Sequence, residues 1–216
     1  MEQQIAYELA VGGVDPQAGL ALFIKHDLGQ TPDSSRAVIF LQRYMRVAFI
    51  AKDFERTAEI LKRLESSSIV KGLTSVNIVG LLTHAKLAIV RNDYDAASDF
   101  VEQASDSNKE DFFLAYEILI RPLETLLAYK TKDYKEADKL IQRNIKWLRS
   151  RRISLLASSW IYFFQIIEAL VNYEMTGEPI RQSLLNNYDE KFKPESPDYY
   201  ILLETELAPF KINAQK

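Results

Sequence analysis

The segment DYKEAD, residues 133–138, decides the fold because it recurs along the chain at a fixed interval. Similar segments stand 40 and 80 residues earlier, as DYDAAS at 93–98 and DFERTA at 53–58. A degenerate copy, GVDPQA, lies at 13–18, and TGEP at 176–179 lies near the expected position of a fifth. Self-similarity at such a period is typical of proteins built from repeated structural units. The sequence therefore predicts about five units.

Each residue type in the repeated segment has a structural role. Aspartate accepts hydrogen bonds from the free N–H groups at a helix start and suits the positive end of the helix dipole. The aromatic residue that follows it can pack back over the preceding helix. The small residue three or four positions further on lets two helices approach closely. The segment is therefore interpreted as the turn and the second helix of a helical hairpin.

Long segments with apolar periodicity precede the turns, and shorter amphipathic segments follow them. The predicted first helices are 35–51, 73–91, 112–131 and 153–175, and the second helices are 54–65, 94–104, 134–148 and 179–190. Pro16 and Pro179 are expected at first helical positions, where proline is tolerated. Short polar linkers are predicted at 29–34, 66–68 and 105–108. The hairpins thus cover 1–28, 34–67, 71–106, 110–150 and 153–191 of a single domain, 1–216, with a capping segment at 197–211.

The composition favours an all-α protein and excludes several classes of function. With only 7 glycines and 7 prolines in 216 residues, the chain is poor in the tight turns that sandwiches and barrels need. The net charge of −3 gives no general attraction to phosphate backbones, so no nucleic-acid partner is expected. The absence of cysteine excludes disulfides and thiolate sites, and the start MEQQ carries no visible secretory signal. These features predict a cytoplasmic protein.

The longest apolar stretch, 153–173, carries a polar stripe that argues against a membrane span. Ser158, Gln165 and Asn172 recur every seven residues, and Glu168 lies beside them. One polar stripe on an otherwise apolar helix is typical of a helix that packs inside a helical array surrounded by water. No membrane span is expected.

The Asp-aromatic-x-x-Ala turn between two apolar helices resembles the centre of the tetratricopeptide repeat. Residues 73–104 carry Ala85, Tyr94, Ala97 and Ala104 at the corresponding places, and 112–149 carry Tyr134 and Ala137. The resemblance covers 34–150, although the period exceeds the family's 34 residues and its tryptophan-leucine-glycine signature is missing. It implies a right-handed superhelical array of antiparallel hairpins, an α-solenoid, whose first helices line a concave face that binds peptides or proteins.

Nothing in the sequence matches a common catalytic or metal-binding motif. GxGxxG, GxxxxGK[ST], HExxH and GxSxG are all missing, and the two histidines, His26 and His84, lie far apart. The sequence therefore predicts no enzyme, no metal site and no cofactor. An all-helical enzyme that uses carboxylates and arginines of the groove remains an alternative.

Polar stripes on the predicted first helices are the candidate partner-binding residues. If these helices line a concave surface, their side chains form an alternating-charge path that selects a mixed-charge peptide. Ordinary solvated or interhelical faces explain the same pattern equally well. The candidates are Gln42, Arg46, Asn77, His84, Glu117, Arg121, Glu124, Gln165 and Glu168.

A basic run and an apolar tail complete the candidate surfaces. Arg143, Lys146, Arg149, Arg151 and Arg152 surround Trp147 and form a candidate anion patch. Positive charge at the end of a helix also suits its dipole, which is the simpler interpretation. The apolar residues 199–203 and Leu207 need cover, which a cap on the last hairpin supplies, and a homodimer contact is the alternative.

Together these observations predict a non-catalytic scaffold or adaptor that binds a protein or peptide through its first-helix face. The alternative is a ligand- or peptide-responsive sensor domain of a larger regulatory protein.

Overall fold

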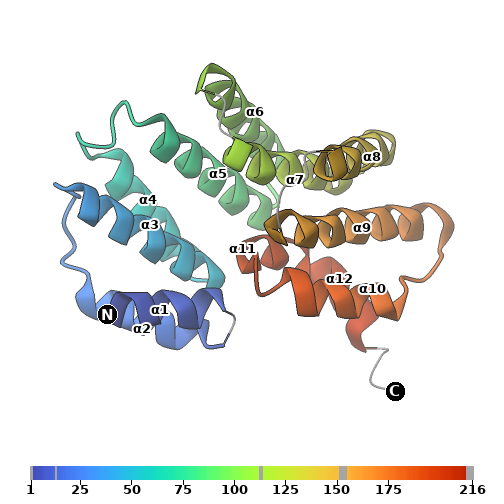
Figure 1. Ribbon diagram of the computed structural model, residues 1–216, viewed down its shortest axis with the longest axis horizontal. Helices are drawn as coiled ribbons and strands as arrows, with labels where there is room; N and C mark the ends of the chain where they lie inside the picture. Colours follow the sequence, from blue (N-terminus) through green and yellow to red (C-terminus); the bar gives the residue numbers. More distant parts are fainter. Residues whose placement is uncertain (1, 13, 112–113, 151–154, 213–216) are drawn as a thin grey trace.

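The computed structural model describes residues 2–12, 14–111, 114–150 and 155–212, and within these ranges it is helical and contains no strand (Figure 1). The first four hairpins pair α1 (Glu2–Val11) with α2 (Pro16–His26), α3 (Ser35–Ile50) with α4 (Phe54–Glu65), α5 (Thr74–Val90) with α6 (Tyr94–Asp111) and α7 (Leu114–Lys130) with α8 (Tyr134–Ser150). α9 (Leu155–Thr176) then packs against α10 (Gln182–Asn187) and the π-helical turn Tyr188–Phe192. The all-α prediction is confirmed.

The turns of the three best-matched hairpins share one backbone geometry. The residue before each aspartate has a positive φ, 62° at Lys52, 59° at Asn92 and 63° at Lys132. The N–H of Asp53, Asp93 and Asp133 donates to the carbonyl oxygen five residues earlier, at 2.9 Å in each case. A left-handed residue that ends a helix in this way satisfies carbonyls that would otherwise lack a partner. The repeat inferred from the sequence is therefore a repeat of structure at these turns.

The aspartates of the motif cap the second helices, as predicted. The carboxylates of Asp15, Asp53, Asp93 and Asp133 accept from the backbone N–H three residues ahead, at 2.9, 3.0, 3.2 and 3.0 Å. The small residues of the motif lie in the helix contacts, where Thr57, Ala97 and Ala137 are fully buried. The aromatic rings also pack back on the first helices, with 5.3 Å between the centroids of Phe54 and Phe49. Local chemistry thus explains where the second helix begins in the first four hairpins.

Two predicted boundaries are wrong. The expected linker 105–108 is helical, because α6 continues to Asp111 and keeps Ala104 and Asn108 buried on one face. Pro179 does not start a helix: Gly177, with a φ of 75°, follows the end of α9, and residues 178–181 carry the buried Ile180 toward the core before α10 begins at Gln182.

Neighbouring hairpins stack through the pairs α2–α3, α4–α5, α6–α7 and α8–α9. Figure 1 shows this order as the chain colours pass from blue through green to orange around the molecule. Among the described residues, no helix combines the length and apolarity needed to cross a membrane. This stacking places the first helices α3, α5, α7 and α9 around the centre of the molecule.

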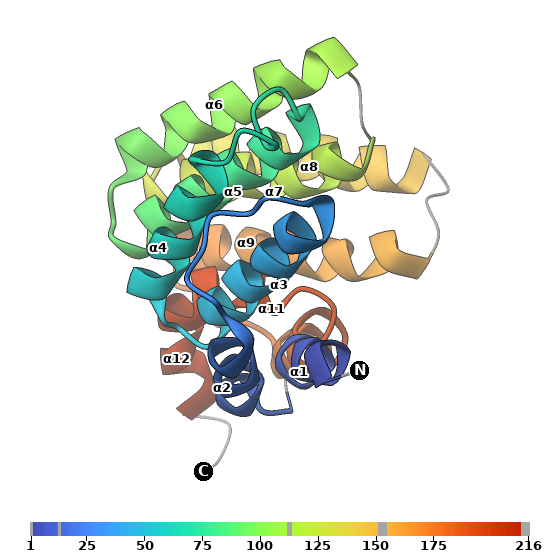
Figure 2. The same ribbon diagram turned by 90° about the vertical axis from the view of Figure 1, so that its left-hand side faces the viewer.

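The C-terminal segment contacts the last hairpin, where the cap was predicted, through Tyr199 on Phe163 and Phe210 on Tyr173, and it also extends beyond that hairpin. It comprises α11 (Pro197–Tyr200), the 3-10 turn Ile201–Leu203 and α12 (Glu204–Ile212), and it returns to the middle of the molecule beside α3 (Figures 1 and 2). Tyr199 donates its hydroxyl hydrogen to the carbonyl of Leu119 in α7, at 2.7 Å, and Glu206 pairs with Lys130. Its apolar residues, which suggested a homodimer contact, are already buried within the chain. The segment therefore joins hairpins that are distant in sequence.

Candidate functional site

The site begins with a hollow between α3 and α5, here called the α3–α5 groove. Its cavity has a volume of 460 Å³ and is bordered by residues of α1, α3, α5, α7 and the C-terminal segment. Residues three or four apart share one face of a helix, so α3 presents Ile39, Arg43 and Arg46 to this hollow. By the same spacing, α5 presents Val79, Leu82 and Lys86. The walls of the groove are thus apolar with a cationic end.

Three charged side chains meet at the floor of the groove. Arg46 Nη2 lies 3.1 Å from Asp198 Oδ1, and Lys86 Nζ lies 2.5 Å from Asp198 Oδ2. The Asp198 side chain is only 8% exposed and that of Lys86 only 12%, so this ion pair is largely shielded from water, whereas the Arg46 side chain is 33% exposed. Arg46 also donates to the Tyr7 hydroxyl at 2.7 Å, and the Lys86 ammonium lies 4.2 Å from the centroid of the Tyr199 ring. These contacts join α1, α3, α5 and α11.

The electrostatics of this cluster keep Asp198 ionised. Burial alone raises the pKa of the Asp198 carboxyl, but the charges of Lys86 and Arg46 and their hydrogen bonds lower it further, leaving that pKa well below its usual range. The same carboxylate raises the pKa of the Arg46 guanidinium. Because two cations share one carboxylate, the cluster carries a net positive charge.

The depressed pKa of Asp198 predicts a loss of stability in acid. The unfolded chain binds a proton at this residue below pH of about 4, whereas the folded chain does not, so the free energy of unfolding should fall as pH drops from about 4 toward 2. Urea denaturation at a series of pH values measures this slope. In Asp198→Asn the slope should be shallower, and an unchanged slope would mean that Asp198 is not the titrating group.

The groove holds more positive than negative charge. Arg43, Arg46 and Lys86 border it, and Asp198 is the sole acidic residue among its described lining residues. The guanidinium carbons of Arg43 and Arg46 lie 5.3 and 5.9 Å from the centroid of the Tyr7 ring, so both cations approach the same aromatic residue. Arg43 donates to the Gln4 side chain at 3.1 Å and forms no ion pair within the described ranges. The arrangement therefore favours an anionic ligand.

Of the predicted partner-binding residues, only Gln42 and Arg46 border the α3–α5 groove. Gln42 also borders a second cavity, of 340 Å³, together with Asn77. His84 faces the second helices: its Nε2 lies 2.7 Å from Glu65 Oε1 in α4, and its ring stacks on Phe100 of α6 at 4.8 Å. Asn77 and His84 thus face away from Arg46.

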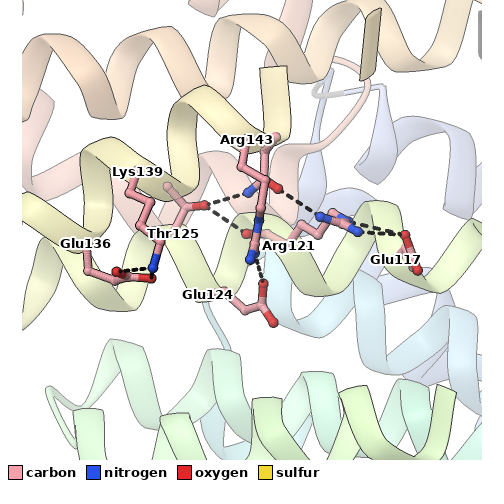
Figure 3. Close-up of polar contacts among 8 residues, drawn as sticks. Glu117, Arg121, Glu124, Thr125, Glu136, Lys139 and Arg143 are labelled. Carbon is pink, nitrogen blue, oxygen red and sulfur yellow. Dashed lines mark hydrogen bonds and ion pairs between the residues drawn. The ribbon is translucent and has the colours of Figure 1, made fainter. Parts of the chain in front are cut away.

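The predicted residues of α7 lie at the contact with α8 (Figure 3). Arg121 donates to Glu117 Oε2 at 3.0 Å and to Asn144 Oδ1 at 3.1 Å, and its guanidinium lies 4.5 Å from the centroid of the Trp147 ring. Glu124 pairs with Arg143 at 3.2 Å. Arg121 and Glu117 stand four residues apart on one helix, a spacing that suits an ion pair. These residues stabilise a hairpin and border a separate cavity of 390 Å³ between α6, α7 and α8.

Gln165 and Glu168 lie on a fourth surface. They border a cavity of 420 Å³ between α9 and residues 178–187, and Glu168 Oε1 accepts from Gln142 Nε2 of α8 at 2.9 Å. The alternating-charge path expected along all first helices is therefore divided among four surfaces. The path is divided because each first helix has several neighbouring helices, and the polar stripe of that helix can face any of them.

The candidate anion patch is described in part. Arg143, Lys146 and Arg149 are exposed on α8, and Arg143 is partly neutralised by Glu124. Arg151 and Arg152 lie outside the described residues. The three described cations point from an exposed helix face, which agrees with the simpler interpretation of charge at a helix end.

The sequence interpretation missed Tyr7, Arg43, Lys86 and Asp198. One signal was present: Lys86 is the only lysine, arginine or acidic residue between 74 and 90. A single charge in an apolar helix requires a partner if the helix is buried. Nothing local identifies that partner, because Asp198 stands 112 residues further along the chain.

Among the described residues, no group of three or more histidine, aspartate and glutamate side chains is placed to hold a metal ion. Comparisons with protein-family models, with curated proteins and with solved structures found no match to the chain. The function has to be inferred from the geometry of the α3–α5 groove.

Proposed function

We propose that the chain is a non-catalytic module that binds a peptide or a peptide segment of a protein in the α3–α5 groove. The observation that carries this proposal is the groove itself, a cavity of 460 Å³ between two first helices, with apolar walls and an excess of cations. Binding clefts of this kind combine apolar area with a few placed polar groups that fix orientation. We therefore assign to the chain the function of a cytoplasmic scaffold or adaptor that requires no cofactor.

We also infer that the hairpins form a tetratricopeptide-like right-handed superhelix. The common turn at Lys52, Asn92 and Lys132 supports this inference, because equal turns at equal intervals place successive hairpins in related orientations. In such an array the first helices line one face. That face contains the α3–α5 groove.

A peptide suits the groove better than a compact small molecule. Ile39 is 50% exposed at its rim, and Val76, Val79 and Leu82 continue the apolar wall along α5. An extended chain presents side chains along such a wall while its backbone reaches polar groups such as Gln42 and Thr83. Burial of this apolar surface drives association.

A second candidate function is a ligand-responsive sensor domain of a larger regulatory protein. One observation favours it: Arg46 contacts both Tyr7 and Asp198, so the groove is built from segments at both ends of the chain. A ligand that draws Arg46 away from Asp198 would change how the C-terminal segment packs. Differential contacts of that kind are what a switch requires.

The proposal is tested by selection from a displayed library of random nonapeptides. Wild type should enrich peptides that Ile39→Trp fails to bind, because the indole ring fills the groove from a half-exposed position that leaves the core intact. Leu28→Trp is the matched control, since Leu28 is 82% exposed and does not border the groove. Peptides that bind wild type and Ile39→Trp equally would place the interaction elsewhere and overturn the proposal.

A further inference from the structure

We propose that the peptide bound in the α3–α5 groove is acidic, and that an aspartate or glutamate side chain of the ligand binds between the guanidinium groups of Arg43 and Arg46. This inference rests on the function proposed above and names the chemistry of the ligand.

The first step is the charge balance of the groove. Three cations border it against the single carboxylate of Asp198. Asp198 is shared by Arg46 and Lys86, so it neutralises one positive charge and leaves two. Like charges confined to one hollow raise each other's energy, and a ligand carboxylate relieves that repulsion.

The second step is the supply of free hydrogen-bond donors. A guanidinium group carries five N–H donors. Among the contacts within the described residues, Arg46 uses Nη1 for Tyr7 and Nη2 for Asp198, and Arg43 uses Nη1 for Gln4. Both groups therefore retain N–H donors, and both are held in place beside the Tyr7 ring. Guanidinium groups bind carboxylates with paired, charge-assisted hydrogen bonds.

The third step is the choice of a peptide over a small anion. Inorganic anions would leave the half-exposed Ile39 and the partly exposed Val76 and Val79 in contact with water. A peptide covers these side chains while its carboxylate reaches the cations. The exposed basic run on α8 offers no comparable combination, because Arg143 is already paired with Glu124. The groove is where charge and apolar area occur together.

The experiment uses three pools of fluorescent pentapeptides that are acetylated and amidated at their ends, so that only side chains carry charge. The central residue is aspartate or glutamate in one pool, asparagine or glutamine in the second and lysine in the third, with leucine, phenylalanine, alanine and serine at the other positions. Fluorescence anisotropy measures binding to the full chain. We expect the acidic pool to bind about tenfold more tightly than the amide pool, with a difference that shrinks at high salt.

Arg43→Gln should remove most of that difference, whereas Arg149→Gln, the same charge change on the exposed face of α8, should preserve it. Circular dichroism checks that both variants fold. Equal binding of the acidic and amide pools, lost in Ile39→Trp, would overturn the acidic preference while the proposed peptide-binding function stands. No binding of any pool would instead refute the proposed function. Complete competition by millimolar inorganic phosphate would show a site for small anions and overturn the peptide inference.

Discussion

Asp198→Ala is expected to lower the free energy of unfolding by about 3–5 kcal/mol at pH 7. The substitution leaves the Lys86 ammonium, only 12% exposed, and the Arg46 guanidinium without their shared carboxylate. Removing one member of a buried ion cluster is costly because the remaining charges stay desolvated without compensation. Chemical denaturation followed by circular dichroism measures the change.

The matched control is Asp106→Ala, which removes the carboxylate of an exposed lysine pair, Asp106 with Lys109, and should change stability little. A second variant separates the ion cluster from a loss of packing. Adding Lys86→Met to Asp198→Asn removes the more deeply buried of the two cations and should restore part of the lost stability, because an apolar side chain needs no partner in this place. If Asp198→Ala costs no more than Asp106→Ala, the cluster does not hold the C-terminal segment.

The hairpins could be predicted because their determinants are local. Asp133 caps the helix that it begins, and Lys132 adopts its left-handed conformation within the same turn, so a few adjacent residues specify the whole feature. The same holds for the ion pair of Arg121 with Glu117, which lie four residues apart on one helix. Because a few adjacent residues specify each of these features, the same sequence pattern is found wherever the feature is found in the structure.

The groove could not be predicted because its determinants are distant. A polar stripe on a first helix shows which residues share a face, but it does not show which neighbour that face meets. His84 and Lys86 are two residues apart on α5, yet His84 faces α4 and α6 while Lys86 faces the C-terminal segment. Which neighbour a side chain of α5 meets depends on where residues 196–212 dock, and that docking depends on packing across the whole chain.

Phe163→Ala is expected to cost about 3–5 kcal/mol of the free energy of unfolding. Phe163 is fully buried, and its ring lies 5.8 Å from Trp160, 5.2 Å from Phe192 and 6.2 Å from Tyr199, centroid to centroid. These rings belong to α9, to the π-helical turn and to α11, so the substitution opens a cavity where three elements meet. Denaturation followed by circular dichroism measures the loss, and the fluorescence of Trp160, which packs against Phe163, should change as well.

Tyr173→Ala provides the control on the same helix, because Tyr173 is exposed and contacts Phe210 at the surface, so its loss should cost much less. The decisive comparison combines Phe163→Ala with Asp198→Ala. Tyr199 packs on the aromatic cluster and adjoins Asp198, so both substitutions weaken the docking of the same segment. If that segment docks as one unit, the double variant should lose less stability than the sum of the two single losses. Additive losses would show that the ion cluster and the aromatic cluster hold the chain independently.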